Sequence, residues 1–105
     1  MKDLYPMAVY LFGKLKVKNW DWYAEYKVVV EALVEKHSGK YLVKGGKIEQ
    51  LEGSEAPPGA VVLVEFPSME HVHQFYQDPE YRPMIELRKV SGVDTTLLVV
   101  EGFSG

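Results

Sequence analysis

Residues 59–67 read Gly-Ala-Val-Val-Leu-Val-Glu-Phe-Pro, and this stretch decides the fold class. Apart from Glu65, the run is apolar at every position, which is typical of a short strand covered on both of its faces. Gly59 and Pro67 bound the run, because glycine and proline both interrupt strands. We therefore predict a central strand at residues 60–66 and interpret the rest of the chain outward from it.

The sequence after this strand predicts two helical pieces and a last strand. A short helix is expected over residues 68–77, with Ser68 as its N-cap. The dipeptide at 78–79, Asp-Pro, ends it, and a second helical piece is expected to begin at Pro83, because proline is tolerated in the first turn of a helix. Residues 95–100 are apolar at both alternating parities and form the last predicted strand.

The sequence before residue 60 predicts a strand and a longer helix. Residues 7–17 are rich in Val, Tyr, Leu and Phe, which favours a strand. Asn19 is a suitable N-cap for a helix that is expected to end near Gly39, where glycine adopts the left-handed conformation without steric cost. The apolar stripe of this helix falls at Tyr23, Tyr26, Val30, Leu33, Val34 and His37.

Two short, polar strands are expected to form an edge hairpin. Residues 40–44 and 47–51 flank the pair Gly45-Gly46, which can supply the positive φ angles of a two-residue turn. Residues 53–59 contain two consecutive prolines and are predicted to form a surface loop.

This order of elements predicts a single α+β domain over residues 1–105: a ferredoxin-like split β-α-β sandwich, in which helices cover one face of a four-stranded antiparallel sheet. The other face would carry Tyr10, Phe12 and one parity each of the two apolar strands. Exposing such side chains forgoes roughly 1.5–3 kcal/mol each. We therefore expect a homodimer, in which the sheet of a second copy covers this face.

Composition excludes several classes of function. Fifteen acidic and twelve basic residues among 105 give a net charge of −3, which provides no positive field for nucleic acid. The absence of cysteine excludes a disulfide scaffold and thiolate metal centres, and is compatible with a reducing, cytoplasmic compartment. The longest apolar run, residues 7–12, is far shorter than the ~20 residues of a membrane span, so no membrane association is expected.

Four residues carry candidate chemistry. Glu65 interrupts an apolar strand, and a carboxylate on a buried face needs a partner or a raised pKa, so we expect it to point into a pocket. His37 is a candidate acid or base, the alternative being a helix-end histidine bonded to backbone carbonyls. Tyr26 would orient substrate or simply fill the core. Arg88 would pair with such a carboxylate or with an anionic ligand.

The same pocket is expected to include Tyr41 and Tyr76 as ligand-binding residues. His71 and His73 are two positions apart, so on a helix their side chains diverge and no metal site is predicted. There is no phosphate-binding glycine loop before a helix, and no cofactor is expected.

Several segments, spread from residue 7 to residue 102, resemble the family named domain of unknown function 1330. The matching segments are Tyr23-Ala24-Glu25-Tyr26, residues 37–46, Leu51-Glu52-Gly53, residues 64–70, Phe75-Tyr76, residues 78–81, Leu87-Arg88 and Val100-Glu101-Gly102. The resemblance implies a dimeric α+β barrel, a superfamily that also holds antibiotic-biosynthesis monooxygenases, haem-degrading enzymes and small ligand-binding modules. It implies no particular reaction.

Two positions differ from the pattern of this family. Lys44 stands before the glycine pair where relatives commonly have Arg, and residues 54–57 lack the Trp that is associated with that loop. A lysine lacks the planar guanidinium group with which an arginine binds a carboxylate through two hydrogen bonds.

Three functional hypotheses follow. The first is a cofactor-independent enzyme that acts on a small organic molecule, oxygenase-like or isomerase-like by analogy of fold, with Tyr26 orienting substrate, His37 or Glu65 as base and Arg88 holding an anion. The second is a ligand-binding or sensor module that uses the same cavity without turnover. The third is a structural dimer in which side chains fill the cavity.

Overall fold

A computed structural model describes residues 8–103, so Met7, the expected first residue of the first strand, lies outside the described part. The elements follow in the predicted order, with a helix–helix corner between the last two strands. They are β1 (Val9–Lys16), α1 (Tyr23–Lys36), β2 (Lys40–Lys44), β3 (Ala60–Phe66), α2 (Met69–Gln77), α3 (Arg82–Val90) and β4 (Asp94–Glu101).

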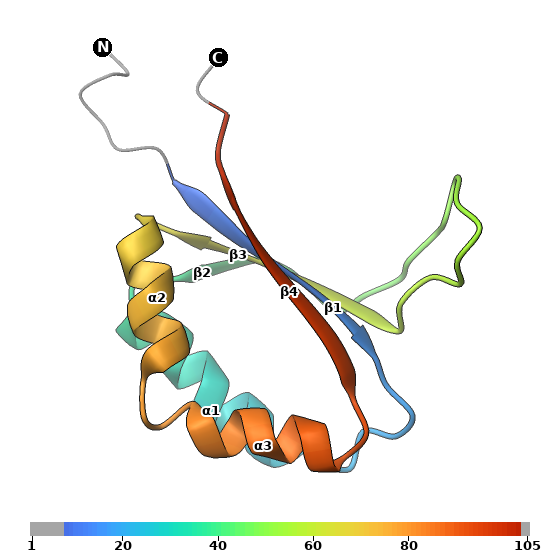
Figure 1. Cartoon of the computed structure of the whole chain (residues 1–105), viewed down its shortest axis with the longest axis horizontal. Helices are drawn as coiled ribbons and strands as arrows, with labels where there is room; N and C mark the ends of the chain where they lie inside the picture. Colours follow the sequence, from blue (N-terminus) through green and yellow to red (C-terminus); the bar gives the residue numbers. More distant parts are fainter. Residues whose placement is uncertain (1–7, 104–105) are drawn as a thin grey trace.

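The four strands form one antiparallel sheet in the order β2-β3-β1-β4. All three helices lie on one side of this sheet, and no described helix lies on the other side (Figure 1). This is the ferredoxin-like α+β architecture that the sequence predicts. β3 has the predicted bounds and lies between β2 and β1, so its central position is confirmed.

The predicted edge hairpin is wrong. β2 pairs with β3 across a long connection, and residues 47–51 form no strand. Gly45 and Gly46 do adopt positive φ angles of 71° and 90°, but they direct the chain out of the sheet into the loop that projects away from it in Figure 1. The loop is closed on itself by Gln50, whose side-chain amide donates to two backbone carbonyls of the loop.

Both predicted ends of the first helix need correction. Trp22 precedes the first residue of α1, and Asn19 instead accepts a hydrogen bond from the backbone N–H of Asp21 in the turn before the helix. At the other end the left-handed residue is Ser38, with φ 67°. Gly39 is required for packing instead, because a Cβ there would lie 2.8 Å from the Phe66 ring.

The helix–helix corner follows the predicted sequence signals. Ser68 is the N-cap of α2 and accepts from the backbone N–H of His71, as predicted. Its hydroxyl also bonds the His71 ring, with Oγ and Nδ1 2.7 Å apart. Pro83 lies in the first turn of α3, which begins one residue earlier.

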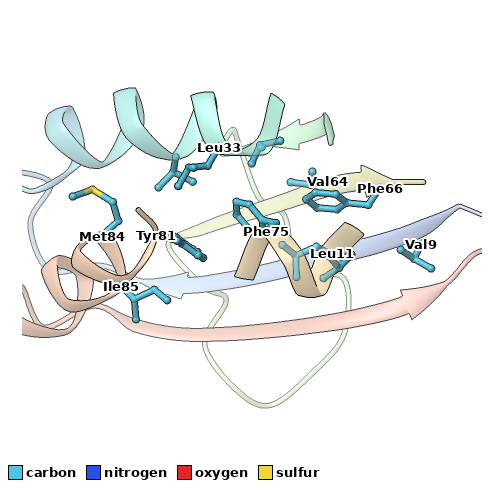
Figure 2. Close-up of a cluster of buried hydrophobic side chains, with 12 residues drawn as sticks. Val9, Leu11, Leu33, Val64, Phe66, Phe75, Tyr81, Met84 and Ile85 are labelled. Atoms are coloured by element: carbon cyan, nitrogen blue, oxygen red, sulfur yellow. The ribbon is translucent and has the colours of Figure 1, made fainter. Parts of the chain in front are cut away.

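The core lies between the helices and the inner face of the sheet. In Figure 2, Val9 and Leu11 of β1 and Val64 and Phe66 of β3 lie on the sheet side, while Leu33, Phe75, Met84 and Ile85 come from the helices. Tyr81, at the α2–α3 corner, lies among them. This layer fixes where α1 and α3 lie over the sheet.

The outer face of the sheet is apolar, as predicted. Register places Tyr10 opposite Glu65 and Val100, and Phe12 opposite Leu63 and Leu98, on the side that no described helix covers. Leu98 and Val100 are more than half exposed.

Candidate functional site

A cavity of about 310 Å³ lies between α1 and the inner face of the sheet. Its floor comes from all four strands, its roof from α1, and one wall from the α2–α3 corner and α3. Aromatic side chains supply much of the lining: Trp20, Trp22, Tyr23, Tyr26, Tyr41, Phe75 and Tyr81. Smaller residues on the floor, among them Ala60, leave the space that these rings surround.

The aromatic end of the cavity is held together by ring contacts at the start of α1. Trp22 is 5% exposed, and its ring lies 5.8 Å from that of Trp20 and 5.1 Å from that of Tyr26. The indole N–H donates to the backbone carbonyl of Asn19, which satisfies the one polar atom of this side chain. The turn at Asn19 therefore positions the wall of the cavity.

A chain of three polar side chains crosses the cavity wall. Arg88 Nη2 donates to the Tyr81 hydroxyl at 3.3 Å, and the Tyr81 and Tyr26 hydroxyl oxygens are 3.3 Å apart. Arg88 is 5% exposed, and its guanidinium carbon lies 5.7 Å and 5.8 Å from the ring centroids of Tyr26 and Tyr81. The cation is thus surrounded by two aromatic side chains.

The phenols of this site are held in the neutral form. Burial raises the pKa of Tyr26 far above its ordinary value, and the nearby Tyr81 raises it further. Burial also raises the pKa of Tyr41 to about 12. At neutral pH both hydroxyls therefore carry a proton and can donate a hydrogen bond to a ligand.

The mouth of the cavity carries charged side chains. Lys44 of β2 forms an ion pair with Glu31 of α1, and its ammonium lies 5.0 Å from the centroid of the Tyr41 ring. Lys27 also lines this end. Glu31 is the one carboxylate on the cavity lining within residues 8–103.

The structure brings three of the six predicted site residues together. Tyr26, Tyr41 and Arg88 all line the cavity. The other three, His37, Glu65 and Tyr76, lie outside it, for different reasons.

Glu65 faces the opposite side of the sheet, so the prediction that it points into the pocket is wrong. It shares the outer face with Tyr10, whose hydroxyl donates to its carboxylate at 3.2 Å. This hydrogen bond raises the pKa of Tyr10. The carboxylate thus has a partner, but it is a phenol on the face that we expect a second copy to cover.

His37 holds the end of α1 to the α2–α3 corner. Its Nε2 atom donates to the Asp78 carboxylate at 2.8 Å, and Lys36 Nζ lies 2.9 Å from the same oxygen. The other oxygen of Asp78 accepts from the backbone N–H of Glu80. These bonds, that of His37 foremost, hold the pKa of the Asp78 carboxyl well below its usual range. His37 is therefore bonded to a carboxylate, and not to the backbone carbonyls of the alternative interpretation.

Tyr76 lies on the far side of the corner. The residue is 41% exposed, and the Arg82 guanidinium carbon lies 5.8 Å from the centroid of its ring. Tyr76 lines a second groove, of about 400 Å³, that shares Arg88, Thr95 and Leu97 with the main cavity. Arg88 thus separates the two spaces.

Sequence reasoning missed several residues of the site. Trp22, Tyr81 and Thr95 line the cavity, and Asp78 anchors its wall. Asp78 attracted notice solely as a helix-ending residue before proline, and Tyr81 falls between two predicted helices where periodicity gives no signal. An aromatic cluster at residues 20–26 was the one signal that could have located the cavity.

Within residues 8–103, no group of three or more His, Asp or Glu side chains is arranged to hold a metal ion. None of the helices in this part of the chain combines the length and apolar character that crossing a membrane requires.

A sequence profile of one protein family matches residues 8–103, nearly the whole chain. The chain belongs to the family named domain of unknown function 1330. No curated protein sequence matches the chain significantly.

Solved structures share the fold of this member of the family. A protein of unknown function from Rhodopseudomonas palustris is 18% identical and aligns with a TM-score of 0.73, over 95% of this chain and 85% of that one. A protein from Caulobacter crescentus, provisionally assigned as an antibiotic biosynthesis monooxygenase, is 18% identical and has a TM-score of 0.60. The alignment covers 98% of this chain and 97% of that one. A dimeric, ferredoxin-like protein of unknown function from Bacteroides fragilis is 16% identical with a TM-score of 0.53, covering 90% and 96%.

One of the two positions at which the sequence is expected to differ from the family pattern, Lys44, lies at the cavity mouth. Lys44 is paired with Glu31 and lies beside the Tyr41 ring. A lysine in this pair contributes a compact charge and no bidentate fork. The charge that faces the interior of the cavity is therefore that of Arg88.

Proposed function

We propose that this chain is a homodimeric protein whose cavity takes a small organic molecule, and that it acts on this molecule as an enzyme without a cofactor. The observation that carries the proposal is the cavity itself. Its volume of about 310 Å³ is at the lower end of the range of about 300–1,000 Å³ that is usual for ligand sites. Its walls are mainly aromatic and aliphatic, with a few polar groups, as ligand sites require.

The polar groups suit a reaction in which negative charge develops on an oxygen atom. Tyr26 and Tyr41 are neutral donors, and Arg88 is a buried cation on the same lining. Oxygenase-like and isomerase-like reactions of carbonyl compounds and phenols share an enolate or phenolate, and preorganised donors stabilise such an anion. Glu31 takes the place that Glu65 and His37 held in the sequence-based hypothesis, since its carboxylate lines the cavity and can accept a proton from a ligand.

The outer face of the sheet supports the homodimer. Leu98 and Val100 are exposed on it, and the sheet of a second copy would remove them from water. One similar structure, from Bacteroides fragilis, is described as dimeric. A cytoplasmic location stays a prediction from the cysteine-free composition.

A non-catalytic ligand-binding or sensor module is the second candidate. It is favoured by the fact that, within residues 8–103, no histidine lines the cavity, while its one carboxylate is engaged by Lys44. A site whose single carboxylate is held in an ion pair would bind an anion through its donors without changing it.

Ligand screening with mass analysis tests the proposal. The purified protein is mixed with pools of small organic acids, phenols and ketones, and thermal stability is measured. A ligand at 100 times its Kd stabilises the folded state by about 2.7 kcal/mol. Each hit is then incubated with the protein and its mass spectrum recorded. Conversion supports the enzyme, and binding without conversion supports the sensor.

Two tryptophan variants locate the binding site. Val62→Trp places an indole on the cavity floor and should abolish the stabilisation. The control Val28→Trp makes the same replacement at an exposed position of α1, outside the cavity, and should leave the stabilisation unchanged. Failure of every pool to stabilise the native protein, or equal loss in both variants, would refute the proposal.

A further inference from the structure

Three polar atoms on the cavity lining are buried and have no hydrogen-bond partner. One of them, Oε2 of Glu31, belongs to the ion pair with Lys44. The other two, Nε of Arg88 on α3 and Oγ1 of Thr95 on β4, have no partner of any kind among residues 8–103. Both residues line the main cavity, and both line the groove on its far side. A buried donor without a partner is costly, and native structures seldom leave two in one place.

Arg88 also lacks a counter-charge. None of the ion pairs among residues 8–103 includes it, although its side chain is almost completely buried. Its hydrogen-bond partner, the Tyr81 hydroxyl, is neutral, and the ring faces of Tyr26 and Tyr81 compensate the charge in part. Arginine stays protonated in proteins, so the charge persists. Asp94 lines the far groove with Arg88 but is exposed to solvent and forms no ion pair with it.

We propose that the ligand of this cavity is an aromatic carboxylate, whose carboxylate group is bound by the guanidinium of Arg88 and the hydroxyl of Thr95. The inference rests on the proposed function, since it names the class of molecule that the cavity takes. A carboxylate supplies the missing charge and accepts from both unpartnered donors at once.

The rest of the lining defines the body of the ligand. Rings of Trp22, Tyr26 and Phe75 face the same space, and flat aromatic groups pack well against such side chains. An engineered cavity of about 150 Å³ holds one benzene molecule. The present cavity has about 310 Å³, roughly twice that volume, which matches two fused rings.

The charge of the ligand is limited to about one unit. Within residues 8–103, Arg88 is the one buried cation on the lining, because Lys44 is already paired with Glu31 and Lys27 is exposed to solvent. A phosphate dianion would bring a second charge without a partner. A monocarboxylate therefore fits the site better than a phosphate ester.

A matched pair of probes, 2-naphthoate and 2-naphthamide, tests this inference. The two molecules have nearly the same shape and differ in charge, and calorimetric titration at pH 7.5 gives Kd for each. We expect 2-naphthoate to bind at least about tenfold more tightly, because a hydrogen-bonded charge is worth more than a neutral hydrogen bond.

Two variants test whether Thr95 and Arg88 cause the preference for 2-naphthoate. Thr95→Val removes the hydroxyl and keeps the shape, and Arg88→Met removes the cation and keeps much of the volume. Each should reduce the preference for 2-naphthoate by about fivefold or more. Thr96→Val and Arg82→Met are the matched controls, because both residues lie outside the cavity lining, and neither should change the preference. Thr95→Val changes so little volume that it keeps the test valid even where Arg88→Met fails to fold.

The outcomes separate the two proposals. If both probes bind equally well to the native protein, the carboxylate inference is overturned while the cavity remains a ligand site. A preference that survives both Thr95→Val and Arg88→Met places the anion elsewhere, which also overturns it. If neither probe binds and the screen described above finds no ligand, the proposed function fails, and the carboxylate inference fails with it.

Discussion

Replacing Tyr81 with phenylalanine removes a single oxygen atom at which two hydrogen bonds meet. Arg88 Nη2 donates to this hydroxyl, and the Tyr26 hydroxyl lies 3.3 Å from it. Tyr81 is 2% exposed, so water does not readily replace the lost group. Tyr81→Phe therefore leaves both neighbours short of a partner, whereas Tyr26→Phe leaves the bond between Arg88 and Tyr81 in place.

The geometry sets the expected magnitudes. A buried donor left without a partner costs about 1–3 kcal/mol. Both hydrogen bonds are long, 3.3 Å, so we assign each of the two neighbours a cost of about 1 kcal/mol, the lower part of this range. Tyr81→Phe should therefore lower the free energy of unfolding by about 2 kcal/mol. Tyr26→Phe should cost about 0.5–1 kcal/mol. For a domain of this size, 2 kcal/mol corresponds to a fall in Tm of roughly 8 °C or more.

Urea denaturation measures these differences. The protein concentration is held fixed, because the stability of the proposed dimer would depend on it. The double variant Tyr26→Phe with Tyr81→Phe should be little less stable than Tyr81→Phe alone, since the second hydroxyl has already lost its partner. Tyr76→Phe is the control, because this half-exposed phenol makes no hydrogen bond within the described residues. Equal effects of Tyr26→Phe and Tyr81→Phe, or full additivity in the double variant, would refute the hydrogen-bonded chain.

Three further predictions concern the corner, the core and the outer face. The hydrogen bond from His37 holds the pKa of the Asp78 carboxyl low in the folded state. The stabilisation from this carboxylate is therefore present above the unfolded pKa of about 4 and is lost as the pH falls below that value. Urea midpoints should show Asp78→Asn to be less stable than the native protein at pH 7, and the difference should close below about pH 4. Gly39→Ala should cost about 1–3 kcal/mol by overpacking, measured by urea denaturation, whereas Gly59→Ala, whose Cβ meets no atom closer than 3.6 Å, should be nearly neutral. Light scattering at micromolar concentration should give a dimer mass for the native protein and a monomer mass for Leu98→Lys, and a dimer in both would place the interface elsewhere.

The elements with strong local signals were predictable from sequence. β3 has the predicted bounds because a glycine and a proline delimit an apolar run, and α2 begins after the predicted Ser68 cap. The order of these elements was sufficient to predict the ferredoxin-like sheet.

The partner of β2 was not predictable from local signals. Two glycines with positive φ are equally compatible with a tight hairpin and with the start of a long loop. Residues 47–51 carry three polar side chains and form no strand, and β2 instead pairs with the central strand β3. The choice depends on tertiary pairing and not on the turn.

The face on which a strand residue lies cannot be decided when both faces are apolar. Alternation placed Glu65 with Val61 and Leu63, and this grouping is correct. Nothing in the run indicated which of the two groups meets the helices, because Val61 and Leu63, which are grouped with Glu65, are as apolar as the residues of the other group. The register with β1 decides it: Phe66 pairs with buried Val9, and Glu65 pairs with Tyr10 on the outer face.

The position of Glu65 on the outer face also removes it as a partner for Arg88. The sequence left two partners open for this arginine, a carboxylate of the protein or an anionic ligand. The sheet now separates Arg88 from Glu65, Asp78 is bonded to His37 and Lys36, and Glu31 is paired with Lys44. Asp94 lines the far groove with Arg88, but it is exposed to solvent and forms no ion pair with the guanidinium. None of these four carboxylates therefore neutralises the buried cation. A molecule that enters the cavity can supply the negative charge, and the unpartnered atoms of Arg88 and Thr95 mark where we propose that its charged group binds.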